Sequence, residues 1–298
     1  MTYVDDGKLD LDKPLYKYLS YPDIAHDERY KKITARMVLS HRSGFPNWRA
    51  DYKENKLFIS FEPGTDFMYS GEGYQYLAMV LKEIDQTDWQ GLDQKFQDKI
   101  CQPLGMTHTV FIQNDYTKAF KAQPYDEDGN WISPERDFDQ DVRNRFIAPA
   151  SIHTEPIDFS KWMIGLMDNK ILSEESFNEM YKVHSLAHVY NGIKVDYTLG
   201  FYKIGIPFTN IYSHGGNNHG FTAFFVVDPK KKWGFVLFTN SEYGEELGGE
   251  VLMYTMAGPD KTKLYLLVGV IILSILTILF VLIRWLVRLV RKHGRTTN

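Results

Sequence analysis

The chain has 298 residues, of which 44% are hydrophobic and 15% aromatic, so it can form one large core or two modest ones and is too apolar for a disordered chain. Seven of the 34 Lys and Arg residues lie from Lys261 onward, with no Asp or Glu there, and the first 260 residues therefore carry 27 basic and 38 acidic side chains. An acidic body argues against nucleic-acid binding, which depends on basic side chains at phosphates, and the single cysteine, Cys101, excludes an intrachain disulfide.

Helical patterns occupy most of the first two thirds of the chain. Apolar spacing and capping residues predict helices over residues 34–39, 74–84, 89–100, 158–167 and 173–183. Thr34 and Ser173 stand at the positions of N-caps, and Ser173 opens a capping-box pattern.

Strand patterns follow late in the chain. Aromatic and β-branched residues predict strands over residues 198–206, 220–227 and 233–239, and the sequence DPKKKW predicts a turn that makes the last two a hairpin. Helices first and antiparallel strands later are typical of an α+β domain.

Residues 264–283 contain no charged side chain. Twenty helical residues span roughly 30 Å, the thickness of a bilayer's hydrocarbon core. The alternative is a buried core helix, but core helices seldom run so long without a polar face. We therefore predict a domain at 1–258, a linker at 259–263, a transmembrane helix at 264–283 and a basic tail at 284–298.

The charges beside this span predict its orientation. Five Arg and Lys follow it and two, Lys261 and Lys263, precede it, so the C-terminus is expected in the cytoplasm and the main domain in the periplasm or outside the cell. The N-terminus shows no signal-peptide pattern. Either the body stays in the cytoplasm, against the charge bias, or an N-terminal segment is missing.

Two patterns could suggest metal binding. His184 and His188 stand four residues apart on an expected helix but lack a third ligand. Asp126, Asp128 and Asn130 resemble part of a calcium loop, but later ligands are absent and a hairpin turn fits better. We predict no metal and no cofactor.

Three segments stand out together: LSHRSGFP (39–46), FEPGTDFMYSGEGYQYL (61–77) and SHGGNNHGFTAFFVVDP (213–229). With GKLDLDKPLYKYL, PLGMTHT and SIHTEPIDFSKWM, they resemble the serine β-lactamase-like family, which includes class C β-lactamases, D-Ala-D-Ala carboxypeptidases and esterases. The resemblance runs from residue 5 to residue 257. It implies an antiparallel sheet flanked by helices, with a helical subdomain.

The resemblance also implies roles for two residues. Tyr69 would be the tyrosine that relays protons, and His214 would begin the H-x-G motif on the strand that lines the site. A phenol with a pKa near 10 needs an adjacent positive charge to serve as a base. From the residues alone, Tyr69 could instead be a buried tyrosine at a turn, and His214 an ordinary histidine at a strand end.

Further residues complete the expected site. Gly71, Gly215 and Gly216 would let a substrate approach the backbone, and the N–H of Asn217 would be an oxyanion donor. Gly71 stands where the family usually has Asn, which weakens any inference of β-lactam specificity.

Three neighbours of these motifs receive no chemical role. His41 and Ser43 are expected to make local hydrogen bonds. Ser70 follows the tyrosine, and in the family the residue at that position is not the acylated serine.

The family's nucleophile motif, S-x-x-K, is missing. No Ser or Thr in this sequence has a Lys three residues later. In the family the motif lies upstream of the GKLDLD-like segment, and Gly7 is too near the first residue to leave room for it. We therefore expect the first strands and the nucleophile helix to be absent, either because the gene product or its start is truncated or because this is a genuine shortened relative.

Two functions remain open. The first is a membrane-anchored serine hydrolase that acts on an amide or ester, a small molecule or a peptide, but whose chain as given lacks the nucleophile. The alternative is a catalytically inactive membrane-anchored binding or scaffold module that retains the cleft.

Overall fold

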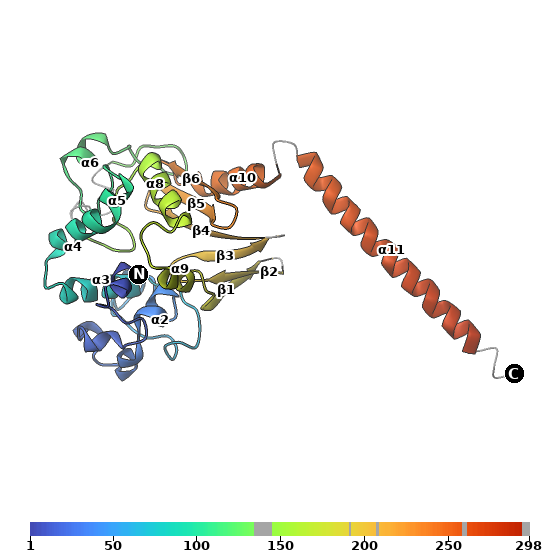
Figure 1. Cartoon of the computed structure of the whole chain (residues 1–298), viewed down its shortest axis with the longest axis horizontal. Coiled ribbons are helices and arrows are strands. Elements are labelled where there is room, and N and C mark those ends of the chain that lie inside the picture. The colour runs from blue at the N-terminus through green and yellow to red at the C-terminus, as the bar shows by residue number, and fades with distance from the viewer. Residues whose placement is uncertain (134–144, 191, 207–208, 258–260, 294–298) are drawn as a thin grey trace. The chain divides into compact units, whose positions relative to one another are not determined.

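The computed structural model describes residues 1–133, 145–190, 192–206, 209–257 and 261–293 (Figure 1). The chain divides into two compact units, Met1–Glu245 and Glu246–Asn298. The first unit combines helices with a six-stranded antiparallel sheet in the order β1-β2-β3-β4-β5-β6. This confirms the predicted α+β fold.

The six strands follow one another along the chain. They are β1 (Ser185–Tyr190), β2 (Ile193–Tyr197), β3 (Tyr202–Ile206), β4 (Thr209–Asn217), β5 (Thr222–Asp228) and β6 (Trp233–Thr239). The β5–β6 hairpin is confirmed, and β3 begins four residues later than residue 198, where we expected it.

Strands β1 and β2 were not predicted, and the expected helix through His184 and His188 is wrong. His184 precedes β1 and His188 lies within it. The pairing of β1 with β2 shifts between Leu186 and His188, so the side chains do not alternate regularly, and the spacing of the two histidines gives no strand signal.

The helices agree more closely with the sequence patterns. They are α1 (Thr2–Asp5), α2 (Ala35–Leu39), α3 (Gly71–Ile84), α4 (Trp89–Phe96), α5 (Gln102–Leu104), α6 (Asp115–Phe120), α8 (Pro156–Met167), α9 (Glu174–Met180), α10 (Gly244–Ala257) and α11 (Lys261–His293). Short 3-10 helices cover Leu15–Lys17, Pro22–Ile24, Glu28–Lys32 and Arg49–Asp51, and a stretch of π-helix covers Gln97–Cys101. The expected caps are present: Thr34 accepts the N–H of Met37 and Ser173 that of Ser176.

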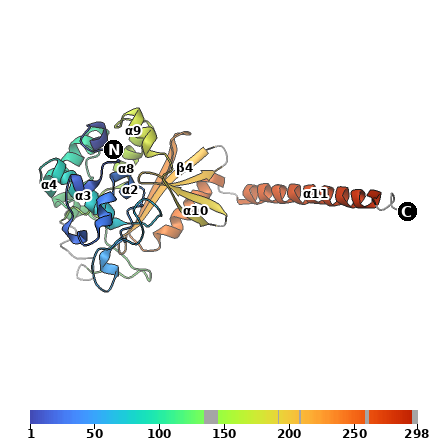
Figure 2. The same ribbon diagram turned by 90° about the horizontal axis from the view of Figure 1, so that it is seen from below.

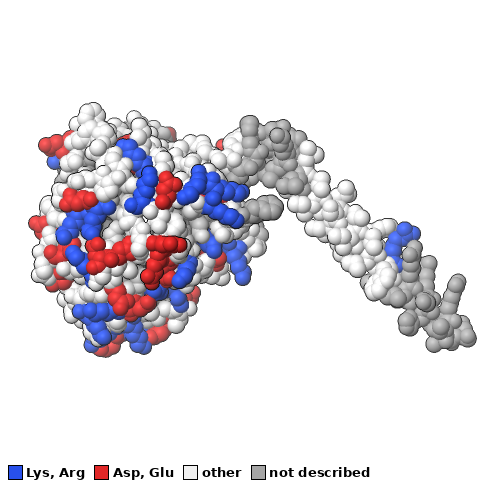
Figure 3. All heavy atoms as spheres, viewed as in Figure 1, with Lys and Arg blue, Asp and Glu red and all other residues white. Residues whose placement is uncertain are grey.

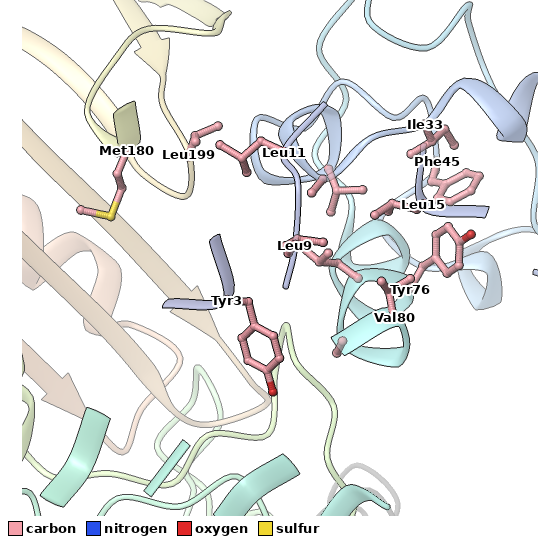
Figure 4. Close-up of a cluster of buried hydrophobic side chains, with 14 of the residues drawn as sticks. Tyr3, Leu9, Leu11, Leu15, Ile33, Phe45, Tyr76, Val80, Met180 and Leu199 are labelled. Atoms are coloured by element: carbon pink, nitrogen blue, oxygen red, sulfur yellow. The ribbon is translucent and has the colours of Figure 1, made fainter. Parts of the chain in front are cut away.

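The core beside α3 holds the start of this helix in place (Figure 4). Tyr76 is fully buried, stacks on Tyr21 with ring centroids 4.4 Å apart, and donates its hydroxyl to the carbonyl of Leu19 at 2.7 Å. Burying an aromatic or aliphatic side chain of this size contributes about 1.5–3 kcal/mol. The first turn of α3, which follows Tyr69, is therefore fixed against the N-terminal segment.

Helix α8 lies on the sheet. The ring of Phe159 contacts Phe225 of β5 and Phe238 of β6, with centroids 5.2 and 5.4 Å apart. In Figure 2, α3, α8 and α9 lie on the same side of β4. The sheet and the helical layer are thus packed together, and β4 is a central strand.

Helix α11 contains the predicted membrane span. Its window Val268–Trp285 has a mean hydropathy of 2.5 and is the one helix in the described residues that is long and apolar enough to cross a membrane. Most of the described part of this helix is white in Figure 3, and its described side chains before Arg284 carry no charge. The predicted linker at 259–263 lies partly outside the described residues, which resume at Lys261 in α11, and the tail beyond residue 293 lies outside them.

Candidate active site

Tyr69 and His214, 145 residues apart, meet in the structure. Tyr69 directly precedes the cap of α3, and His214 lies on β4. The phenol oxygen of Tyr69 is 3.5 Å from Nε2 of His214, and the two ring centroids are 5.9 Å apart.

The hydrogen bonds of His214 indicate the direction of this contact. Its Nδ1 lies 2.6 Å from the carbonyl oxygen of Gly215, and a carbonyl only accepts, so Nδ1 carries the proton. Nε2 is then an acceptor, and the Tyr69 hydroxyl is the donor that faces it. Burial lowers the pKa of His214, which favours this neutral form.

Ser70 is a structural residue that fixes the position of Tyr69. Its hydroxyl accepts the N–H of Gly73 at 2.9 Å, as the N-cap of α3, and donates to the carbonyl of Pro46 at 2.9 Å. Its side chain is 1% exposed. The hydroxyl is buried and makes both an accepted and a donated hydrogen bond, so its geometry is that of a helix cap and not of a nucleophile.

His41 also holds this turn in place. Its Nδ1 accepts the N–H of Ser70 at 3.0 Å, so Nε2 carries the proton and donates to the hydroxyl of Tyr197 at 3.1 Å. The ring is 2% exposed, lies 4.1 Å from the Tyr69 ring, and has its pKa lowered by burial to about 3. Local hydrogen bonding was expected for His41 and also for Ser43, whose Oγ accepts the N–H of Phe45 at 3.2 Å.

Three tyrosines around His41 and His214 were not identified from the sequence as site residues. Tyr74 of α3, Tyr197 of β2 and Tyr202 of β3 surround the two histidines, with Tyr202 5.4 Å from His214 and Tyr197 4.7 Å from His41 between centroids. The sequence evidence for them was a run of aromatic residues in β2 and β3, but such a run does not show which aromatic side chains face the site.

The environment of Tyr69 keeps its hydroxyl protonated. Burial, and next the proximity of Tyr202, raise its pKa to about 12. Neither cause is a cation, whereas a phenol needs an adjacent cation to lower its pKa enough to serve as a base. A protonated phenol is a hydrogen-bond donor at neutral pH and not a base.

The glycines of β4 lie on an exposed stretch of backbone. Strand β3 pairs with β4 only as far as Ser213, whereas β5 continues to pair along Gly215, Gly216 and Asn217. A Cβ on Gly216 would meet no atom within 4 Å. The β3-facing edge of this stretch therefore has no partner strand among the described residues and has room for an extended ligand.

Gly71 is enclosed by neighbouring residues of the N-terminal half of the chain. It is buried at the start of α3, where its N–H donates to Asn47 Oδ1 at 3.0 Å, and a Cβ there would come 3.1 Å from the ring of Trp48. The role of Gly71 in substrate binding stays a prediction.

The candidate metal ligands are held by other contacts. Among the described residues, His108, Glu155 and Asp158 bring their ligand atoms within 4.8 Å of one another. Asp158, however, pairs with Lys161 at 2.8 Å and accepts the His108 N–H, while Glu155 caps α8. These carboxylates are thus used to hold the fold.

The Asp126 segment forms the hairpin turn that we expected. Asp126 Oδ1 accepts the backbone N–H groups of Asp128 and Asn130, and Tyr125 pairs with Trp131 across the turn.

Comparison with known proteins identifies the family and the fold of this chain. The sequence model of the family described as Beta-lactamase matches residues 1–255. Protein flp of Staphylococcus aureus (strain MW2) is 23% identical over an alignment of 271 residues that covers 83% of this chain and 51% of that protein, so the chain spans about half the length of this curated relative.

Two solved structures share the fold. The octameric penicillin-binding protein homologue from Pyrococcus abyssi superposes with a TM-score of 0.70 at 21% identity, over 86% of this chain and 61% of that one. The D-amino acid amidase from Ochrobactrum anthropi SV3, complexed with D-phenylalanine, gives a TM-score of 0.62 at 20% identity, over 80% and 72%.

Proposed function

Because this chain belongs to the Beta-lactamase family, we propose that it binds an amide or ester substrate, a small molecule or a short peptide, at the Tyr69–His214 site. The observation that carries the proposal is the 3.5 Å approach of the Tyr69 hydroxyl to His214 Nε2 beside the open edge of β4. Catalytic hydrogen bonds are often this long without substrate and tighten when it binds.

Each site residue then has a role in binding the substrate or in moving a proton. The Tyr69 hydroxyl donates a hydrogen bond and relays a proton, and His214 receives or orients it. Gly215 and Gly216 let the substrate lie against the β4 backbone, and the N–H of Asn217 is an oxyanion donor.

The missing nucleophile limits the chemistry. An acyl-enzyme needs a serine activated by a nearby base, and no Ser or Thr of this chain is followed by Lys at the third position. We propose that the 298-residue chain binds its substrate without forming an acyl-enzyme, and that hydrolysis requires a form that supplies the Ser and Lys.

A catalytically inactive binding or scaffold module is the second candidate. The raised pKa of Tyr69 favours it, because a phenol that stays protonated suits hydrogen bonding to a ligand and not proton abstraction. The two candidates share the binding step and differ in whether a covalent step follows it.

We also propose that α11 anchors the protein in a membrane. Its apolar window is long enough to span the bilayer, and the excess of Arg and Lys after the window supports a cytoplasmic C-terminal end with the main domain on the other side.

The test uses the full chain in detergent micelles. Calorimetric titration with D-phenylalanine measures binding, and a fluorescent penicillin and a fluorophosphonate measure covalent labelling. We expect saturable binding without labelling. Stoichiometric labelling of a serine would contradict the proposal that this chain forms no acyl-enzyme. If neither D-phenylalanine nor peptides that end in D-amino acids bound detectably, the proposal of a substrate-binding site would be wrong.

A further inference from the structure

The β1–β2 hairpin carries a group of apolar side chains that the described residues cover only by half. Leu186, Val189 and Ile193 are each between 48% and 56% exposed. The hairpin lies at one edge of the sheet (Figure 1). Single apolar residues are ordinary on a protein surface, but a group of neighbours on one hairpin indicates a surface that contacts another molecule.

The bulge in β1 brings two of these side chains to the same face. Leu186 lies opposite Asp196 in the β1–β2 ladder, and Val189 lies opposite Lys194. Alternate residues of a strand share a face, so residues 194 and 196 point the same way and so do their partners on β1. The three-residue spacing of Leu186 and Val189 is thus accommodated by the shifted register between them. Val195, between the two β2 residues, is buried on the opposite face.

The charges beside these side chains are mainly basic. No Asp or Glu occurs from residue 181 to residue 195. Lys194 is exposed and forms no ion pair with the described residues. Asp196, on the same face, lies opposite Lys203 of β3, so a basic residue is its cross-strand neighbour. Apolar side chains beside a free cation are the combination that binds to a bilayer with anionic headgroups.

We propose that this hairpin surface, formed by Leu186, Val189, Ile193 and Lys194, docks on a bilayer that contains anionic lipids. The three apolar side chains enter the headgroup region, and Lys194 lies among the lipid phosphates. The inference rests on the proposed anchoring by α11, because a span in the same chain keeps the domain at a bilayer, where a weak contact is favoured by the high local concentration. The second contact limits the tumbling of the domain on its tether.

Two other occupants fit the hairpin surface less well. A strand added to the sheet would pair along the backbone edge, where the bulge disturbs regular pairing, and would leave these side chains exposed. A second copy that met this chain through the same surface would bring Lys194 of both copies together, and like charges repel. Only the bilayer uses the apolar and the basic side chains at the same time.

The test uses the full chain reconstituted in lipid nanodiscs. Ile193→Cys is labelled with an environment-sensitive fluorophore, while Cys101 is buried and stays unlabelled. Lipids with a nitroxide near the headgroup quench a fluorophore that touches the bilayer. We expect quenching at position 193, stronger when phosphatidylglycerol is added to phosphatidylcholine and weaker at high salt. The same label on Tyr52→Cys, at another exposed residue, is the control and should be quenched little.

Two further substitutions separate the contributions to docking. Lys194→Glu should reduce the ratio of docked to undocked domain by about tenfold in the anionic nanodiscs, because an attraction becomes a repulsion. Leu186→Ser should reduce it by about threefold or more in both kinds of nanodisc, because less apolar surface is buried. Both residues are exposed, and circular dichroism checks that the fold is kept. Unchanged quenching in both variants would contradict the proposed surface.

A probe on Leu276→Cys in α11 reports on the membrane span separately. Quenching at position 276 by nitroxides deep in the bilayer, without quenching at position 193, would refute the docking and leave the anchor in place. Absence of quenching at position 276 would refute the anchor and this inference with it. An emission change at position 193 that follows the protein concentration and not the nitroxide lipids would assign the surface to a second copy instead.

Discussion

The imidazole ring of His41 lies 4.1 Å from the ring of Tyr69, while its Nδ1 accepts the backbone N–H of the next residue, Ser70, at 3.0 Å. On its other side Nε2 donates to Tyr197 of β2 at 3.1 Å. One buried ring therefore ties the turn before α3 to the sheet, and it holds Tyr69 at the distance from which its hydroxyl reaches His214.

We expect His41 to make the stability of the fold depend on pH. Burial lowers its pKa to about 3, whereas the unfolded chain takes the same proton at about pH 6.5. Between these values the unfolded state binds more protons. The contribution of neutral His41 is thus complete above about pH 6.5 and is lost as the pH falls, by about 1.4 kcal/mol of unfolding free energy per pH unit.

Denaturant unfolding of the wild type and of His41→Gln at a series of pH values measures this effect. Gln keeps a donor and an acceptor but does not titrate. The fall in unfolding free energy between neutral and mildly acidic pH should be shallower in the variant, and equal slopes would show that His41 titrates normally.

Ser70→Ala should reduce stability and leave the chemistry unaffected. The variant loses the N-cap of α3 and the bond to Pro46, so the free energy of unfolding should fall by about 0.5–2 kcal/mol. Ser173→Ala, which removes the cap of α9 away from the site, is the matched control. A change in D-phenylalanine affinity for Ser70→Ala, but not for the control, would instead assign the hydroxyl to the site.

Much of the fold could be predicted because its signals are local. The Thr34 and Ser173 caps, the apolar spacing of α3 and the aromatic runs of β5 and β6 each depend on a few adjacent residues. The edge strand β1 was missed because its bulge disturbs the alternation on which strand prediction depends.

The site was only partly predictable for a related reason. Tyr69 and His214 stand in short, distinctive segments, but Tyr197 and Tyr202 reach them only through the pairing of β2, β3 and β4. The pKa of Tyr69 is raised by burial, which depends on the folded surroundings of the phenol and could not be predicted from its short segment.

Trp48 should make Gly71 intolerant of a side chain. A Cβ at Gly71 would lie 3.1 Å from the indole ring and 3.1 Å from the carbonyl oxygen of Asn47. Gly71→Asn should therefore cost about 1–3 kcal/mol of unfolding free energy by overpacking. Trp48→Ala combined with Gly71→Asn should recover part of that loss relative to the two single changes. Strict additivity in this double-mutant cycle would contradict the contact.

The orientation in the membrane can be read from two fusions. A reporter that is active only in the cytoplasm should work when it is attached after Asn298 and fail after Gly258, because the basic residues that follow the apolar window favour the cytoplasmic side. Activity of the Gly258 fusion alone would reverse the orientation. Activity of both would place the two ends on one side and argue against a single span.

Tyr69→Phe tests the function of the site most directly. The ring would still pack on His41, so circular dichroism and unfolding should change little, and only the hydroxyl that faces His214 is lost. A neutral hydrogen bond contributes about 0.5–1.5 kcal/mol, so the affinity for D-phenylalanine should fall by about two- to tenfold. Tyr52→Phe, at an exposed tyrosine, is the matched control.

The same substitution distinguishes a binder from a hydrolase. In a form that carries a Ser-x-x-Lys segment before residue 1, the lysine would favour the Tyr69 phenolate, and Tyr69→Phe should reduce the turnover of a chromogenic ester by at least about a hundredfold. Ser70→Ala should reduce it far less, since its hydroxyl is committed to Gly73 and Pro46. If Ser70→Ala abolished turnover and Tyr69→Phe did not, Ser70 would be the nucleophile, and the roles of these adjacent residues would be reversed.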